Sequence, residues 1–311
     1  MIRIGLVDLD TSHPEAFTRI LRTMDGVEVS ALWDGHDVWP AGYDREFART
    51  HAVPVVCSRL EELPEHVDAA MIHGVNWDTH CEKALVFLKA GKPVLIDKPV
   101  VGSVRDCDRL LDLREKYGVP IYGGSSLRSA REVAALRPAM GPREKVIFVV
   151  ASGPGDFFSY GIHTTEMLQG LVGNGIRSVR WIEDGRSHVL AALFEDGLTA
   201  LIQLQLPFHE WSLSVFTEAG MRTTTVSTDG LYEPFLKSFI AIVREQSPEF
   251  SLAGPVEAVR LHLAAQAARS SGGEVLLDRI PADEGFDGAA FAREYAATKR
   301  KAALLQSGGG A

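Results

Sequence analysis

Cysteine is scarce in this chain. The 311 residues contain three cysteines, at Cys57, Cys81 and Cys107. Their number is odd, and neither a Cys-x-x-Cys spacing nor a neighbouring histidine cluster accompanies them, which argues against a disulfide framework and against a zinc site. We expect each to be a small packing residue in a reducing cytoplasm. No ligand spacing elsewhere in the sequence specifies a metal geometry, so we predict no metal site.

Runs of basic residues and long apolar stretches are missing as well. The net charge is -9, and no run of Lys or Arg forms the basic patch that a nucleic acid requires. The longest apolar stretches, such as 146–152, are strand-length and fall far short of the ~20 residues that span a bilayer. The N-terminus shows no basic segment followed by an apolar signal sequence. We therefore expect a cytoplasmic protein that binds a small-molecule substrate, with neither nucleic acid nor membrane as a partner.

Glycine is missing from the first turn. The apolar run 2–7 leads into a polar turn and then into helical spacing over 14–24, which is typical of the first unit of a dinucleotide-binding domain. Such a turn needs glycines, so that the backbone can approach a pyrophosphate and the helix N-terminus stays open to it. Here Asp8, Asp10 and His13 occupy those positions.

Two carboxylates so close to a pyrophosphate would repel it by about 1 kcal/mol or more each at intermediate dielectric. In addition, residues 12–15, Ser-His-Pro-Glu, have the pattern of a capping box, which would satisfy the helix's own amides. Two interpretations follow from this turn. Either a cofactor binds in a displaced position, or the fold has lost it.

The rest of the chain predicts two domains. Over residues 1–124 strands alternate with helices, which indicates a Rossmann-type, doubly wound parallel sheet of an α/β fold. Residues 125–306 are rich in strands, and the Asp-Gly pair at 195–197 predicts a hairpin, so we expect an α+β domain with a mostly antiparallel, open sheet. A last helical region is predicted over 233–268, and 307–311 form a flexible tail.

Several polar residues follow predicted parallel strands, at the sheet edge where open α/β sheets bind ligands. Asp34 has the position of an acid that binds an adenosine ribose, although an Asp there also serves as a turn former. Lys98 follows an apolar strand; a partly desolvated lysine has a lowered pKa and can act as a general acid or base, whereas the plainer alternative is a surface lysine. His80 is more simply explained as the first residue of a helix.

A second group lies later in the chain. His163 and Glu166 are one helical turn apart, which suits either a proton-handling pair or a helix cap.

Taken together, these motifs resemble the glucose-fructose oxidoreductase, inositol dehydrogenase and rhizopine catabolism (Gfo/Idh/MocA) family. The resemblance rests on Asp97-Lys98-Pro99 after a strand, on Asn76 and His80 one strand earlier, and on Gly-x-His-x-x-Glu at 161–166. It covers roughly residues 1–278. It implies a Rossmann domain followed by a domain whose open sheet packs against another subunit, hence a homo-oligomer. It also implies hydride transfer with NAD or NADP at an alcohol carbon of a sugar, a cyclitol or a similar polyhydroxylated molecule.

The resemblance also implies residue roles. Lys98, His163 and Glu166 would be catalytic, and Arg128, Lys98 and His163 would bind substrate. The chain departs from the family at Asp97, which replaces a Glu, and at Ser159, where the family often has an Asp that Asp156 or Glu166 could replace. The implied cofactor contacts are Asp8, Leu9, Asp10, Thr11, Ser12, Asp34, Gly74, Val75, Asn76, His80, Asp97 and Lys98.

We therefore predict a divergent oxidoreductase of this family in which Lys98 and His163 handle the proton. Two alternatives stay open. One is a cofactor-independent lyase or isomerase that uses the same sheet edge, where Asp8, Asp10, His13, His73, His80, Lys98 and His163 would converge. The other is a non-catalytic member that binds a sugar-like ligand.

Overall fold

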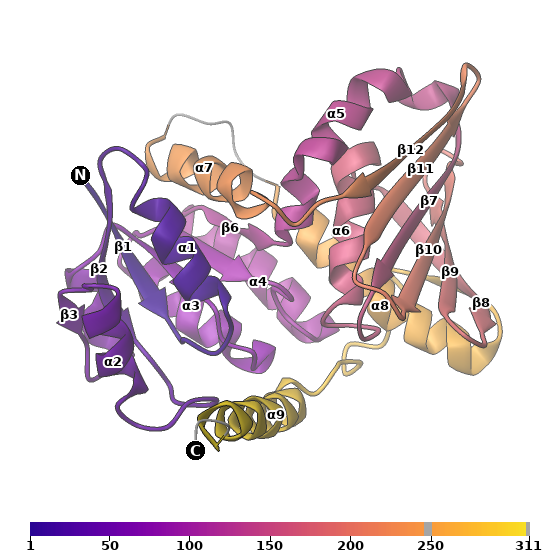
Figure 1. Cartoon of the computed structure of the whole chain (residues 1–311). Coiled ribbons are helices and arrows are strands. Elements are labelled where there is room, and N and C mark those ends of the chain that lie inside the picture. The colour runs from indigo at the N-terminus through magenta and orange to yellow at the C-terminus, as the bar shows by residue number, and fades with distance from the viewer. Residues whose placement is uncertain (246–250, 309–311) are drawn as a thin grey trace.

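The computed structural model describes residues 1–245 and 251–308, and it builds them around two sheets (Figure 1). The first sheet has six parallel strands in the order β3-β2-β1-β4-β5-β6. Their bounds are β1 Ile2–Val7, β2 Val27–Trp33, β3 Val55–Val56, β4 Ala69–Ile72, β5 Val94–Asp97 and β6 Ile121–Gly124. The connecting helices are α1 His13–Leu21, α2 Tyr43–Thr50, η1 Leu60–Glu65, η2 Trp77–Thr79, α3 His80–Lys89 and α4 Val104–Tyr117. The predicted doubly wound sheet is confirmed.

Local chemistry explains these boundaries. Helix α4 begins where Ser103 Oγ accepts the amide of Asp106 at 3.1 Å, and it ends at Gly118, whose φ of 64° is the left-handed conformation that glycine favours. Residues 60–65 form a 3-10 helix, η1, that contains Pro64. Strand β3 is short and lies at the edge of the sheet, where it pairs with β2.

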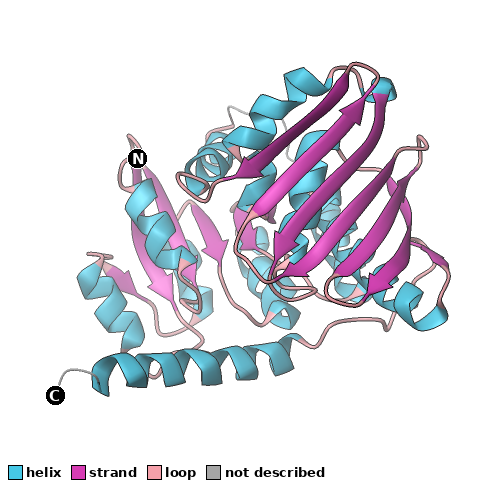
Figure 2. Cartoon of the chain, turned by 45° about the vertical axis from the view of Figure 1, so that its right-hand side comes forward, coloured by secondary structure: helices cyan, strands magenta, loops and turns pink. Residues whose placement is uncertain are grey.

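The second sheet has seven strands in the order β12-β11-β7-β10-β9-β8-β13, and all neighbours are antiparallel except β7 and β10. The predicted hairpin at 195–197 joins β9 to β10. Helices cover one face, whereas the other face is open (Figure 2). The strands are β7 Val146–Pro154, β8 Ile176–Asp184, β9 His188–Phe194, β10 Thr199–Leu206, β11 Trp211–Thr217, β12 Gly220–Val226 and β13 Glu274–Leu276. The helices are η3 Ser126–Ser129, α5 Arg131–Met140, η4 Arg143–Lys145, α6 Gly161–Val172, α7 Tyr232–Val243, α8 Ala253–Ser271 and α9 Gly288–Gly308.

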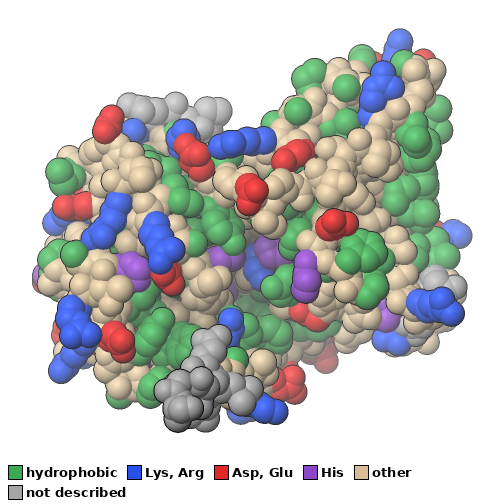
Figure 3. Space-filling view, in the orientation of Figure 1, with side chains coloured by type: hydrophobic (Ala, Val, Ile, Leu, Met, Phe, Trp, Pro, Cys, Tyr) green, Lys and Arg blue, Asp and Glu red, His purple; other side chains and the backbone are tan. Residues whose placement is uncertain are grey.

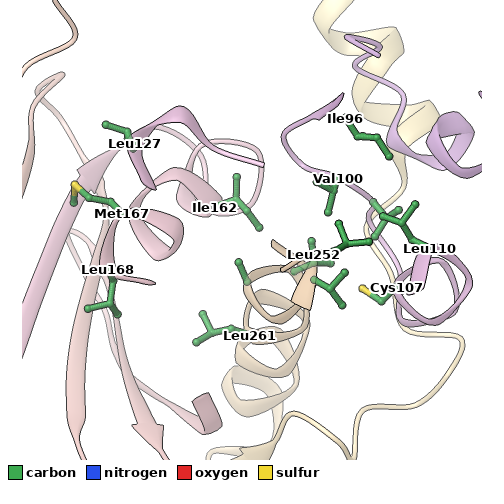
Figure 4. Packing of buried hydrophobic residues seen from close by; sticks show 14 of the residues in the cluster. Ile96, Val100, Cys107, Leu110, Leu127, Ile162, Met167, Leu168, Leu252 and Leu261 are labelled. Carbon is green, nitrogen blue, oxygen red and sulfur yellow. The ribbon is translucent and has the colours of Figure 1, made fainter. Parts of the chain in front are cut away.

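One hydrophobic core joins the two halves. Ile96, Val100 and Cys107 of the first half lie in the same cluster of buried side chains as Ile162 and Leu261 of the second (Figure 4). All three cysteines are free and buried. Because interiors are packed at crystal-like density, this shared core holds the two sheets in one relative position.

The C-terminal helices differ from the prediction. The helical region expected over 233–268 consists of α7, which packs on the first half through Phe235 and Phe239, and α8, which packs on the second sheet. It is not the last helical region, because α9 follows it. The predicted tail overlaps α9 at 307–308, and residues 309–311 lie outside the described residues. Within the described residues, no helix is both long and apolar enough to cross a membrane.

Candidate active site

A cavity of about 390 Å³ lies between the two halves, next to the carboxyl ends of β1, β4 and β5 and the start of α6. Figure 3 shows histidine side chains gathered in the depression between the halves. The volume suits a small ligand, since ligand pockets span about 300–1,000 Å³. Its polar and aromatic lining comprises Thr11, Ser12, His13, His73, Trp77, Asp97, Lys98, Ser126, Asp156, Ser159, Tyr160, His163, Trp211, Thr228, Tyr232, Phe291, Tyr295 and Lys299.

Lys98 follows β5 directly and points its amine into this region. Its Nζ donates to the carbonyl oxygen of Ser159 at 3.0 Å and lies 5.1 Å from the centre of the Tyr160 ring. Burial lowers the pKa of Lys98, although the nearby Asp97 and Asp156 act in the opposite direction. A lysine with a lowered pKa can give or take a proton near neutral pH.

His163 lies in the first turn of α6 and is held from behind. Its Nδ1 is 2.6 Å from Ser125 Oγ, and that oxygen also accepts the amide of Leu127 at 3.1 Å. Burial and the nearby positive charge of Lys98 hold the pKa of His163 well below its usual range. The ring is therefore neutral at neutral pH.

Asp97 links two further histidines that line the cavity. Its Oδ2 lies 2.5 Å from His13 Nδ1 and 3.2 Å from His73 Nδ1, and its Oδ1 accepts the amide of Lys98 at 2.8 Å. Burial raises the pKa of Asp97, but His13 and His73 outweigh it and hold the pKa well below the usual range. An ionised carboxylate only accepts hydrogen bonds, so both Nδ1 atoms donate to Asp97.

In the first turn, Asp8 has a backbone conformation that glycine usually adopts. Asp8 has a φ of 62°, a left-handed conformation that Asp tolerates better than most residues do. Its Oδ2 accepts a hydrogen bond from Lys83 Nζ at 2.6 Å, and both side chains are buried. Gly74 is required beside this pair, because a Cβ there would lie 2.6 Å from Asp8 Oδ2. Lys83 therefore neutralises a carboxylate that the sequence alone leaves uncompensated.

The predicted capping box is wrong. Ser12 makes no side-chain hydrogen bond to the helix, and Glu15 pairs with Arg19 instead. The amide of His13 bonds to Thr11 Oγ1 at 3.1 Å. Ser12 is thus left at the cavity wall, with Thr11 and His13 on either side.

The other two acids of this region are buried away from the cavity. Asp10 Oδ2 accepts the amide of Val75 at 2.9 Å, while its Oδ1 is buried without a partner. Burial and the charge of Asp8 raise the pKa of Asp10 to about 8. Asp34 accepts the amide of Leu9 at 3.2 Å and has no exposed side-chain surface; burial raises its pKa as well.

The structure separates the expected cofactor contacts into two sets. Thr11, Ser12, Gly74, Val75, Asp97 and Lys98 line the cavity, whereas Asp8, Leu9, Asp10, Asp34, Asn76 and His80 do not. His80 is fully buried, and its ring nitrogens lie 2.8 Å from the carbonyl oxygen of Gly74 and 3.0 Å from that of Val100. Through these contacts His80 links the loop after β4 to the backbone at Val100.

Arg128 and Glu166 also lie outside the cavity lining. Arg128 Nε donates to Glu166 Oε2 at 3.2 Å, and its second amino group donates to Gln169 Oε1 at 2.5 Å. Glu166 is buried, and burial raises its pKa although Arg128 opposes the rise. Of the two acids that could replace the one missing at Ser159, Asp156 is the one that lines the cavity, where it accepts the Ser159 hydroxyl at 2.6 Å.

Sequence reasoning missed the aromatic residues of the lining. Tyr160, Trp211 and Tyr232 come from separate elements and carried no spacing signal. Phe291 and Tyr295 belong to α9, and their helical spacing with Ala292 and Ala296 was a usable signal. Within 1–245 and 251–308, no group of three or more His, Cys, Asp or Glu side chains is arranged to hold a metal ion.

The residues present do not fit the adenosine half of a dinucleotide. The acid that would bind the ribose, Asp34, is enclosed, and the turn that would face the pyrophosphate carries Asp8 and Asp10. Gly74 and Val75 lie at the cavity wall, but the loop they begin is covered by α9. What remains open is the end of the groove between the two halves.

Comparisons with known proteins agree with this fold. Residues 3–124 match an oxidoreductase family described as having an NAD-binding Rossmann fold. Inositol 2-dehydrogenase 2 of Saccharopolyspora erythraea is 28% identical over 122 residues, which are 39% of this chain and 34% of that protein. The chain thus spans about a third of the length of the curated relatives it matches first.

Solved structures extend the likeness to the whole fold. The scyllo-inositol dehydrogenase of Lactobacillus casei, crystallised with NAD(H) and scyllo-inositol, has a TM-score of 0.76 at 15% identity and covers 89% of this chain and 99% of its own. The myo-inositol 2-dehydrogenase of Lactobacillus plantarum has a TM-score of 0.75 at 15% identity, covering 88% and 99%. The family match supports NAD or NADP as the cofactor of this fold. Residues 3–124 of the chain thus match the Rossmann domain of the Gfo/Idh/MocA family of oxidoreductases.

Proposed function

We propose that this chain is an oxidoreductase of small polyhydroxylated molecules, such as sugars or cyclitols, in which Lys98 and His163 handle the hydroxyl proton. The observation that carries the proposal is that both side chains line one cavity of about 390 Å³. The inositol dehydrogenase relatives support the substrate class, and NAD or NADP is the cofactor that the family match supports.

The chain's own residues would act as follows. His163 accepts the proton of a substrate hydroxyl; Ser125 holds the ring, and the lowered pKa keeps it unprotonated beforehand. Lys98, anchored on Ser159, donates a hydrogen bond to the same oxygen. Trp211, which also lines the cavity and is buried, excludes water on the side of the second domain.

A second candidate function is supported by the pair of His13 and Asp97. This pair places another proton acceptor in the cavity that holds Lys98 and His163. Proton-accepting groups from both halves suit a lyase or isomerase that removes a proton at one position and returns it at another, without a net change in oxidation state. That reaction needs no dinucleotide.

One experiment separates the two functions. The full-length protein is incubated in D₂O with a panel of cyclitols, sugars and keto-sugars, with and without NAD or NADP, and the products are identified by NMR and mass spectrometry. The oxidoreductase predicts a ketone product that requires the dinucleotide. Deuterium bound to carbon, formed without a dinucleotide and without net oxidation, would favour the lyase or isomerase. Neither product with any compound would contradict both.

Two further assignments belong to this proposal. The open face of the second sheet packs against a second copy of the chain, as the family resemblance implies. A cytoplasmic location also stays a prediction.

A further inference from the structure

The C-terminal helix α9 follows an unexpected path. It lies along the lower edge of the first half in Figures 1 and 2, beneath the loops that follow the parallel strands. It begins beside η2, where the amide of Ala289 donates to Asp78 Oδ2 at 3.1 Å and the Phe291 ring lies 4.8 Å from that of Trp77. Toward its other end, Arg300 Nε donates to the carbonyl oxygen of Val38 at 2.8 Å.

Between these anchors α9 makes an apolar seam with the first half. Ala292 and Ala296 form a buried cluster with Val38, which follows β2, and Val75, which follows β4. Their exposed fractions are 5% and 6%. Small side chains at this spacing let the helix approach both loops closely. The helix thus bridges the carboxyl ends of β2 and β4, with the turn after β1 between them.

This is the edge along which a doubly wound sheet holds the adenosine half of a dinucleotide. Beneath the seam, three polar side chains are already bonded within the chain. Asp8 pairs with Lys83, Asp34 accepts the amide of Leu9, and Trp39 Nε1 donates to the carbonyl oxygen of Leu9 at 3.0 Å.

The other end of the groove remains open. The cavity wall includes Thr11, Ser12 and Val75, and α9 contributes Phe291 and Tyr295 to it. The open end therefore has room for a ligand of the size of a sugar or a mononucleotide, but not for an intact dinucleotide.

We propose that α9 is a built-in cover that occupies the adenosine half of the dinucleotide groove, so that NAD or NADP binds only when the helix is displaced. The apparent affinity for the dinucleotide is then the intrinsic affinity multiplied by the fraction of molecules in which α9 is displaced. This inference goes beyond the proposed function, because it concerns dinucleotide binding and holds whatever substrate the cavity accepts.

The test uses the full-length protein and a pair of matched variants. Ala296→Glu places a charge in the seam, and Ala297→Glu makes the same change at the next, exposed position of α9. Hydrogen–deuterium exchange over 288–303 measures displacement of the helix, and calorimetry with NAD, NADH, NADP and NADPH measures binding. We expect faster exchange and at least tenfold tighter dinucleotide binding in Ala296→Glu, and no change in Ala297→Glu.

A second variant keeps the test decisive if Ala296→Glu fails to fold. Phe291→Ala with Arg300→Ala removes an anchor at each end of the seam without burying a charge. Faster exchange with unchanged dinucleotide binding would overturn the proposal. So would tight binding to the wild-type chain with α9 still protected, or unchanged exchange in both seam variants. None of these readouts depends on turnover, so failure here is distinct from failure of the proposed function.

Discussion

His13 Nδ1 lies 2.5 Å from Asp97 Oδ2, and this contact joins the first turn of the chain to the residue that precedes Lys98. His13 stands where the dinucleotide-binding pattern has a glycine, and Asp97 stands where the family has a Glu. The two departures therefore meet in one contact. The shorter acid leaves room for a histidine ring that also stacks on Phe17, with ring centres 5.1 Å apart.

From this contact we predict the effect of His13→Gln. If His13 accepts a proton during turnover, kcat should fall about 100-fold while KM changes little, and one limb of the pH–rate profile should disappear. Asp97→Asn should also lower kcat, because it removes the acceptor that fixes the His13 tautomer. The matched control is His66→Gln, outside the cavity. An unchanged pH profile in His13→Gln would assign the ring a structural role.

Lys98→Ala should abolish turnover and leave the melting temperature nearly unchanged. Lys98 is half-buried and its Nζ makes one hydrogen bond, to the carbonyl oxygen of Ser159, so its removal costs little folding energy. Lys89→Ala, an exposed lysine of α3, is the control. Retained activity in Lys98→Ala would contradict the catalytic role.

The Lys83–Asp8 pair predicts a change in stability. Lys83→Met leaves the buried Asp8 carboxylate unpaired, which should lower the free energy of unfolding by about 3–5 kcal/mol. Lys89→Met, on the exposed face of the same helix, should change it by less than about 0.5 kcal/mol. Urea denaturation measures both. Equal stability of the two variants would show that Lys83 does not stabilise Asp8.

Asp10 predicts a pH dependence of stability. Its pKa in the folded chain is about 8, against 3.8 for an ordinary Asp. Between these values the folded chain keeps the proton and the unfolded chain loses it, so rising pH favours unfolding by up to about 1.4 kcal/mol per pH unit from this group. Asp10→Asn should therefore gain stability relative to wild type as the pH rises from 5 to 8. The free energy of unfolding of both proteins is measured by urea denaturation at each pH. If it changes equally with pH in wild type and in Asp10→Asn, the prediction is wrong.

The open sheet predicts an assembly. Leu201 and Phe148 lie on its uncovered face, because Ala200 and Ile202 of the same strand point into the core. Leu201→Glu should shift the protein from an oligomer toward a monomer in light scattering, since a charge would be buried between two copies. Ala297→Glu adds the same charge elsewhere and should leave the mass unchanged. If the wild-type protein is a monomer in light scattering, the predicted packing of the open sheet against a second copy is wrong.

Part of the site was readable from the sequence because it follows from topology. Once the alternation of strands and helices predicts a parallel sheet, residues that follow β4 and β5 must meet at one edge. Lys98, Gly74 and Val75 line one cavity for that reason. The Asp-Gly pair at 195–197 predicted its hairpin because the turn chemistry is local.

Local sequence patterns could not predict side-chain contacts between residues that are far apart in the chain. Asp8 looked uncompensated until Lys83, 75 residues away, proved to neutralise it. Arg128 and Glu166 looked like site residues, whereas they satisfy each other behind the cavity. The capping box was wrong because the Glu15 side chain found Arg19 instead.

By itself, the sequence determined the two-domain architecture, the lysine and the histidine of the cavity, and the loss of glycines from the first turn, because these depend on residue identity and short spacing. Only the tertiary structure decided what took the place of those glycines. Burial of Asp8, Asp10 and Asp34 is stable because Lys83 and backbone amides reach them, and the groove above is covered because the small residues of α9 fit against Val38 and Val75. Such fits depend on distances between remote segments, which no local pattern encodes.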